Sequence, residues 1–245
     1  MTVIDINNKA LQQSHKGHVI EFFGLSGVGK TTVARAVLQE LRKSGSDVAG
    51  IEDYLGTRRR PYARHARRLL LCALEAPTII SNFRVLWSFL AVRQERIFDH
   101  AKIAYNVCTL MAVMARARRA GKVLLLDEGL IQAIWSALLY ARSATNAEPA
   151  AELLKNLDNW PTEVVVLSST TELTRARLEE RESKHSRLQS RAEADVWTRA
   201  ETLHDHLLDH LSVASKRQVR QLHIFEAEGH SVEELTAGVM DALNT

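Results

Sequence analysis

The sequence predicts an α/β fold in which five parallel strands alternate with helices. Short apolar runs recur between longer segments of helical periodicity, and a glycine-rich loop joins the first run to the first helix. Strands that alternate with helices pair in parallel through right-handed crossovers. At 245 residues, with 46% hydrophobic and 25% charged residues, the chain suits a single domain over residues 1–245 with a core of its own.

The expected elements follow a polar lead-in over residues 1–17. We expect strands at Val19–Phe23, Val48–Ile51, Lys122–Asp127, Pro161–Ser168 and Leu222–Glu226. We expect helices at Thr32–Ser44, Leu130–Arg142, Ala147–Asn156, Thr171–Arg181, Glu193–Ser215 and Ser231–Leu243, the last with Ser231 and Glu234 as a capping box.

A helical region over about residues 55–120 separates the second and third strands. It breaks around Ala76-Pro77, and from about Phe83 it reads as a long apolar-periodic helix or a helix pair, ended by Gly121. This connection is far longer than the usual crossover between strands. We therefore expect a helical insertion that covers a site.

The stretch from Phe23 to Thr32 has the G-x-x-x-x-G-K-[ST] spacing of a phosphate-binding loop. Its glycines let the backbone wrap a phosphate chain at the positive end of the following helix. Lys30 adds a cation for the β- and γ-phosphates, and the Thr31 hydroxyl can ligate Mg²⁺. The residues expected to hold the nucleotide are Gly24, Ser26, Gly27, Val28, Gly29, Lys30, Thr31 and Thr32.

Asp127 closes the third apolar run, where a carboxylate can hold Mg²⁺ opposite Thr31. The alternative is an aspartate that caps the turn after a strand. Glu128 follows directly, and it fits three roles equally well. It could activate water, as the second residue of an Asp-Glu pair does in hydrolytic motors; it could hold a substrate; or it could pair with an arginine.

Arginines are frequent in the segment 171–191, directly after the fourth strand. Arg177 and Arg181 are four residues apart and share a helix face, so together they could neutralise charge on a transferring phosphoryl group. The alternative is a solvated helix on which the arginines pair with Glu179, Glu180 and Glu182. The position after the strand favours a lid that carries Arg177 and Arg181 as catalytic residues.

Candidate substrate contacts surround the end of the second strand. Asp53 lies where it could orient or deprotonate an acceptor hydroxyl, next to Tyr54, although helix or turn capping explains it equally well. The basic segment 58–68 begins with Arg58 and could bind an anionic acceptor or a nucleic-acid backbone, or form a solvated helix face. Arg93 and Arg96 are weaker candidates for the same pocket.

The motifs Gly24–Thr31, Leu124–Gly129 and the arginine-bearing segment together resemble phosphate-loop kinases, and thymidylate kinase among the nucleoside monophosphate kinases most of all. The loop itself is also similar to that of adenylylsulfate kinase. The resemblance implies a P-loop nucleoside triphosphatase fold of the kinase type with strand order 2-3-1-4-5. Two positions differ from thymidylate kinase, because Asp127-Glu128 replaces an Asp-Arg pair and Glu52-Asp53-Tyr54 replaces Arg-Glu-Pro-Gly.

Two functions fit these observations. The leading hypothesis is a kinase that uses ATP and Mg²⁺ to phosphorylate a nucleotide-like or other small anionic or hydroxyl-bearing acceptor. ATP is favoured because the guanine-reading Asn/Thr-Lys-x-Asp motif is absent. The alternative is an ATPase or ATP-binding switch that acts with a protein or nucleic-acid partner, supported by Glu128 and the basic segment.

Composition limits the setting of either function. The net charge of +3 is mild, and the two cysteines, Cys72 and Cys108, lie in apolar helical surroundings that suit free thiols in a reducing compartment. No signal peptide or membrane-spanning run is recognisable, so we expect a cytoplasmic protein without membrane contact, and a homodimer is compatible with the sequence.

Overall fold

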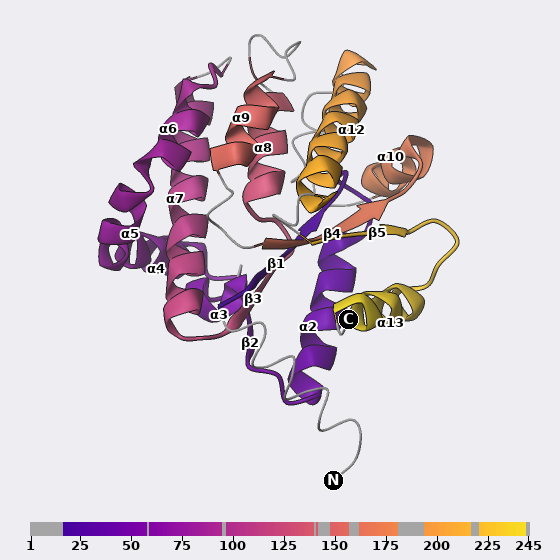
Figure 1. Ribbon diagram of the computed structural model, residues 1–245, viewed down its shortest axis with the longest axis horizontal. Coiled ribbons are helices and arrows are strands. Elements are labelled where there is room, and N and C mark those ends of the chain that lie inside the picture. Colours follow the sequence, from indigo (N-terminus) through magenta and orange to yellow (C-terminus); the bar gives the residue numbers. More distant parts are fainter. Residues whose placement is uncertain are drawn as a thin grey trace.

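Five parallel strands form one sheet at the centre of the molecule, in the order β2-β3-β1-β4-β5 (Figure 1). The computed structural model describes residues 17–57, 59–94, 97–139, 141, 148–156, 162–180, 194–216 and 221–243. The strands are β1 (Val19–Phe23), β2 (Val48–Gly50), β3 (Val123–Leu126), β4 (Thr162–Ser168) and β5 (Leu222–Glu226). The predicted fold class and strand order are confirmed.

Both faces of the sheet are buried along β1 to β4, where successive side chains of a strand enter different cores, whereas the edge strand β5 is only partly buried. Val164 and Val166 of β4 belong to one apolar cluster, and Val165 and Leu167 belong to the other. Side chains of a strand alternate between faces, so a strand covered on both sides must be apolar throughout. This arrangement explains why the strands were recognisable as continuous apolar runs.

Helices cover the two faces unequally (Figure 1). On one face α2 (Lys30–Lys43) packs beside α13 (Val232–Leu243). The opposite face is covered by a larger group of helices, which are α7 (Ile97–Arg119), α8 (Leu130–Leu139), α9 (Glu148–Asn156) and α12 (Ala194–Lys216). The helix α10 (Thr171–Glu179) follows β4 at the edge where that strand ends.

Several helices lie between β2 and β3. They are α3 (Ile51–Leu55), α4 (Pro61–Leu74), α5 (Ala76–Ser81), α6 (Phe83–Ala91) and α7. The break at Ala76-Pro77 was predicted, and α5 begins there. The region after Phe83 is a pair of helices, separated by a segment in which Gln94 bridges to Ala141. The helices α4, α5 and α6 all pack against α7, which joins them to the core.

Element boundaries differ from expectation mainly near Ile51, which begins α3 where the sequence suggested a strand. The Asp53 carboxylate accepts a hydrogen bond from the Gly50 backbone N–H over 2.6 Å, so a helix cap ends the strand early. At α13 the expected capping box is present, since Ser231 and Glu234 each bond to the backbone N–H of the other. The expected lead-in over residues 1–16 lies outside the described residues.

Candidate nucleotide-binding site

The phosphate loop connects β1 to α2 at the carboxyl edge of the sheet. Gly24 and Gly27 have φ angles of 149° and 102°, in the region that favours glycine. A Cβ on Gly24 would overlap the carbonyl oxygen of Leu167, and one on Gly27 would lie 2.6 Å from the carbonyl oxygen of Thr174. Neighbouring backbone therefore leaves room only for glycine at both positions.

Lys30 and Thr31 open α2 directly behind this loop. Lys30 is 7% exposed, and its Nζ donates to the Gly24 and Leu25 carbonyl oxygens over 2.7 and 2.8 Å. The first turn of α2 carries no acidic side chain that would repel an anion at the positive helix end. Ammonium and backbone N–H groups thus converge at the loop, and this donor set fits a bound triphosphate.

Asp127 faces Thr31 across the loop. The Thr31 hydroxyl donates to the Asp127 carboxylate over 3.2 Å, although 96 residues separate them in sequence. This contact follows from the parallel pairing of β1 with β3, in which Glu21 lies opposite Leu126, the residue before Asp127. Hydroxyl and carboxylate oxygens are hard ligands of the kind that Mg²⁺ takes together with phosphate oxygens. The described residues hold no group of three or more His, Cys, Asp or Glu side chains that could bind a metal ion, so phosphate oxygens would have to complete a Mg²⁺ site here.

His204 of α12 approaches the loop from beneath. Its ring stacks on Phe23, the last residue of β1, with centroids 5.1 Å apart. Burial lowers the pKa of His204 and the nearby Lys30 lowers it further, while Asp205 acts in the opposite direction. A neutral His204 places no second positive charge beside Lys30.

Glu21 supports the segment that carries Asp127 and Glu128. It lies 1% exposed on β1, and its carboxylate accepts a hydrogen bond from the backbone N–H of Gln132 over 2.9 Å, in the first turn of α8. A Cβ on Gly129 would overlap this carboxylate. A buried carboxylate at a helix N-terminus is favourable electrostatically, so Glu21 fixes α8 beside the loop.

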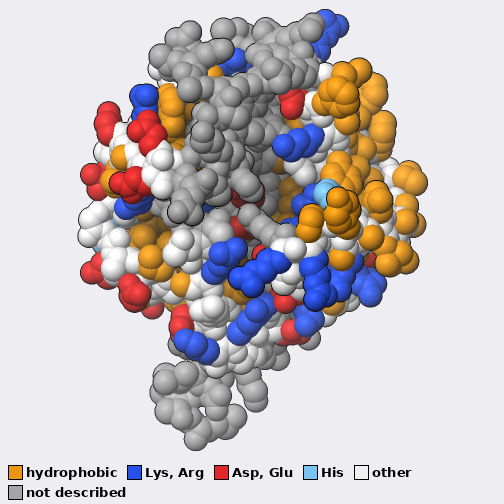
Figure 2. Space-filling view, turned by 180° about the vertical axis from the view of Figure 1, so that it is seen from behind, with side chains coloured by type: hydrophobic (Ala, Val, Ile, Leu, Met, Phe, Trp, Pro, Cys, Tyr) orange, Lys and Arg blue, Asp and Glu red, His pale blue; other side chains and the backbone are white. Residues whose placement is uncertain are grey.

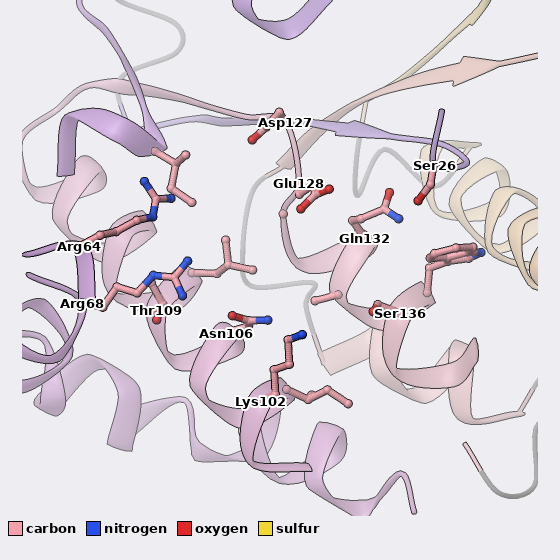
Figure 3. A pocket seen from close by; sticks show the side chains of 16 residues that line it. Ser26, Arg64, Arg68, Lys102, Asn106, Thr109, Asp127, Glu128, Gln132 and Ser136 are labelled. Atoms are coloured by element: carbon pink, nitrogen blue, oxygen red, sulfur yellow. The ribbon is translucent and has the colours of Figure 1, made fainter. Parts of the chain in front are cut away.

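A cavity of about 420 Å³ opens next to the phosphate loop (Figure 3). Its walls come from the loop, from the start of α8 and from the helices α3, α4 and α7. The polar lining residues are Ser26, Arg64, Arg68, Lys102, Asn106, Thr109, Asp127, Glu128, Gln132 and Ser136. Cations from α4 and α7 therefore share one cavity with the two carboxylates that follow β3.

The structure brings together some of the predicted site residues. Ser26, Asp127 and Glu128 all line the cavity, beside Lys30 and Thr31. The helix that carries Arg177 packs on the loop, and a Cβ on Gly27 would lie 2.9 Å from Cγ of Leu178 in that helix. Arg177 itself is half-buried and does not line the cavity.

Other predicted residues lie away from the cavity. Asp53 caps α3 and forms an ion pair of 2.5 Å with Arg42, which lies in the last turn of α2, whereas Lys30 begins that helix. Of its two proposed roles, the structure therefore favours the cap. Tyr54 packs partly buried against the core, and Arg93 is exposed. The predicted residues Arg58, Arg96 and Arg181 lie outside the described residues.

Several lining residues were not selected from the sequence as site residues. Arg64 and Arg68 belong to the basic segment 58–68, and their spacing of four residues, which places both on one helix face, is the sequence signal for their position in the cavity. Lys102, Asn106 and Gln132 gave no local signal, because single polar residues on long apolar helices are common. The fold alone brings them to the cavity.

The parallel sheet, the glycine loop and the Thr31–Asp127 contact define a P-loop nucleoside triphosphatase. The sequence matches the model of the ATPase family associated with various cellular activities (AAA) over residues 20–196, more than half of the chain. The chain belongs to the AAA ATPase family, whose members use ATP and Mg²⁺. No curated protein matches the sequence at a significant level.

This match corrects the resemblance to thymidylate kinase and other phosphate-loop kinases, and the small-molecule kinase hypothesis built on it is wrong. The loop from Gly24 to Thr31 and an apolar strand that ends in aspartate occur in ATPases as well as kinases, so they did not separate the two classes. Glu128, where thymidylate kinase has arginine, pointed toward the ATPase. Among the described residues, no helix is long and apolar enough to cross a membrane.

Proposed function

We propose that the chain hydrolyses ATP and that its nucleotide state controls the binding of a protein partner. The observation that carries the hydrolytic part is the contact of Thr31 with Asp127, which lines the cavity together with Glu128. When bound, ATP supplies the terminal phosphate and Mg²⁺ withdraws negative charge from its oxygens. Lys30, Thr31 and Asp127 are the residues that would hold them.

Glu128 is the candidate base for activating water. Its side chain is exposed and lines the cavity next to Asp127, so water can reach it. A carboxylate within reach of the attacking water can accept its proton, a contribution of about 10²–10⁴ in rate. Asp127, which accepts a hydrogen bond from the Thr31 hydroxyl, then remains available as a metal ligand.

The test compares Glu128→Gln with wild type in phosphate release from ATP, without any added acceptor. We expect about a hundredfold or greater loss of kcat in the variant, with ATP binding retained, because glutamine preserves shape but cannot take the proton. Glu180→Gln, at an exposed position outside the cavity, is the matched control. Hydrolysis at the wild-type rate by Glu128→Gln would refute this role for Glu128.

The partner surface is proposed on the helices α4–α7. Large apolar side chains project from them into solvent; we call this set the outer face, and it comprises Tyr62, Leu69, Leu70, Leu74, Ile80, Phe83, Trp87, Ile97 and Phe98. Figure 2 shows hydrophobic side chains gathered along one side of the molecule, next to Lys and Arg side chains. Exposed apolar patches of this kind mark interaction sites.

The charges around the outer face indicate what binds it. The sequence from residue 55 to 99, which spans the outer face, contains nine arginines and three acidic residues, Glu75, Glu95 and Asp99. Glu75 is fully buried and paired with Arg119, so it does not offset the exposed arginines. A second copy of the same face would oppose arginine with arginine. An apolar protein surface with acidic residues at its rim fits better.

Nucleic acid is the competing partner. Arg59, Arg60 and Arg67 are exposed and could contact phosphates. The aliphatic side chains of Leu70 and Ile80, 60% and 71% exposed, can neither pair with a phosphate nor stack on a base as an aromatic ring does. The large apolar component is the observation that favours protein.

The partner experiment captures proteins from cell extract on wild-type chain and on a Leu70→Ser/Trp87→Ser variant, with ATP or ADP present, and then repeats binding with the purified partner. We expect an acidic protein whose affinity depends on the nucleotide and falls about tenfold or more in the variant. Salt-sensitive binding of nucleic acid that is lost on replacing Arg59 and Arg60, without effect of the apolar changes, would contradict the proposal.

A further inference from the structure

We infer that the cavity beside the phosphate loop binds a small compound that carries both an oxyanion and hydroxyl groups. Arg68 and Gln132 are, in this inference, the residues that recognise the two parts. The ligand would lie next to the nucleotide, and no transfer of a phosphoryl group to it is implied. The inference does not depend on ATP hydrolysis, because binding can be measured with ADP in the loop.

The first support is a cationic wall. Arg64 and Arg68 lie four residues apart on α4 and are both half-buried, whereas Arg67 between them is exposed. Lys102 of α7 adds a third cation to the lining. In Figure 3 the two arginines extend from their helix into the same space as Lys102 and Asn106. Paired guanidinium groups on one helix face are well placed to hold an oxyanion.

The second support is an incomplete hydrogen-bond set on Arg68. Its Nε is buried and has no hydrogen-bond partner within the described part of the chain. The guanidinium carbon lies 5.4 Å from the centroid of the Tyr105 ring, which orients the group without accepting its N–H. A buried N–H without an acceptor is unfavourable, and an oxyanion in the cavity would supply the acceptor.

The third support lies on the opposite wall. Gln132 is 8% exposed and lines the cavity, and its Oε1 has no hydrogen-bond partner among the described residues. Gln132 Oε1 is a hydrogen-bond acceptor, so a donor such as a ligand hydroxyl group would satisfy it. An oxyanion alone would satisfy Arg68 and leave Gln132 unmatched. A ligand that carries both an oxyanion and a hydroxyl group would satisfy both residues at once.

The size of the cavity sets the scale of the ligand. Its volume of about 420 Å³ falls within the range of small-molecule sites. A sugar-sized compound with one phosphate, sulfate or carboxylate combines that size with both chemical requirements. The three oxyanions satisfy the arginines in the same way, so the experiment must distinguish them.

The experiment is calorimetric titration of the full chain saturated with ADP and Mg²⁺, which fills the phosphate loop. The probes are glucose 6-phosphate, glucose 6-sulfate, glucuronate and inorganic phosphate. We expect at least one sugar probe to bind more tightly than inorganic phosphate. The probe that binds most tightly indicates whether the natural ligand carries a phosphate, a sulfate or a carboxylate. The affinity for ADP in each variant reports whether the protein is folded.

Three variants test whether the probes bind at a defined site or are attracted only by the general positive charge of the protein. Arg68→Gln should weaken all oxyanion binding about tenfold or more, because it removes a charge-assisted contact. Gln132→Leu should weaken the sugar probes by a similar factor and leave inorganic phosphate within about twofold. Arg84→Gln, at an exposed position outside the cavity lining, should change neither.

Three results would overturn the inference. One is that no probe binds the ADP-loaded protein, and another is that Arg68→Gln binds as tightly as wild type while retaining ADP. The third is that Arg84→Gln weakens binding as much as Arg68→Gln, which would indicate only general positive charge. Arg64→Gln offers a second variant if Arg68→Gln loses ADP affinity.

Discussion

The phosphate loop and the outer face of α4–α7 differ in whether their side chains have partners within the chain. At the loop, neighbouring backbone crowds the glycines, and Lys30 and Thr31 already have partners within the protein. On the outer face, Trp87 and Phe98 project into solvent. The polar side chains Lys30 and Thr31 of the loop are hydrogen-bonded within the chain, whereas the apolar side chains of the outer face are exposed to solvent. In the proposed function, the loop residues bind ATP, and a separate set of helices recognises the partner.

Core packing beneath the outer face gives the largest expected effect. Phe89 of α6 is 1% exposed, whereas Trp87 two residues earlier is 60% exposed. Phe89→Ala should lower the free energy of unfolding by about 3–5 kcal/mol, and Trp87→Ala by roughly 0.5 kcal/mol or less. Denaturant unfolding measures both. Equal losses would mean that Trp87 belongs to the core and that the outer face is not free.

Crowding at the loop gives the next effect. Gly27→Ala introduces a Cβ 2.6 Å from the Thr174 carbonyl oxygen, while Gly45 also has a positive φ, 84°, but nothing within 4 Å of its Cβ. We expect Gly27→Ala to weaken ATP binding about tenfold or more and Gly45→Ala to cost only about 1 kcal/mol of stability. Comparing the two variants distinguishes the effect of a steric clash, which only Gly27→Ala introduces, from the effect of a positive φ, which both positions share. Unchanged ATP affinity in Gly27→Ala would show that the loop is less rigid than described.

A smaller effect is expected at Asp53, which the structure places at the cap of α3. Asp53→Ala should reduce stability by about 1 kcal/mol through the lost cap, with little added by the exposed ion pair to Arg42. ATP hydrolysis should stay within about twofold of wild type, because contact with Arg42 places Asp53 at the far end of α2 from the loop. A large loss of ATP hydrolysis would show that Asp53 contributes to the active site and does not only cap α3.

The smallest effect is a pH dependence at His204. Burial lowers the pKa of His204 below the ordinary histidine value of 6.5, so as pH falls the unfolded chain takes up the proton first. Stability contributed by the neutral ring is complete above pH 6.5 and is lost as pH falls below that value. The fall in free energy of unfolding between pH 7.5 and 5.5 should be smaller in His204→Leu than in wild type. Identical pH dependences would contradict this.

The fold and the use of ATP and Mg²⁺ could be predicted from the sequence because both depend on local patterns, whereas the roles of the individual site residues stay predictions. Apolar runs specified β1, β3 and β4, and the loop from Gly24 to Thr31 carries its geometry in its spacing. The cavity could not be predicted in the same way, since Lys102 and Gln132 come to line one cavity only after α7 and α8 pack against each other. The family was assigned wrongly for a related reason. A phosphate loop indicates triphosphate binding, but the reaction depends on residues from distant parts of the chain.

The contact between Glu21 and Gly129 has a consequence for how this chain can change. Glu21 occupies the space that a side chain at position 129 would need, and it also bonds to the first turn of α8. The glycine of the Asp127-Glu128-Gly129 run is therefore required by a residue more than a hundred positions earlier. In relatives of this chain the two positions should vary together, with a larger residue at 129 tolerated only where 21 has become small. Substitution at either position alone would shift the helix that carries the cavity wall.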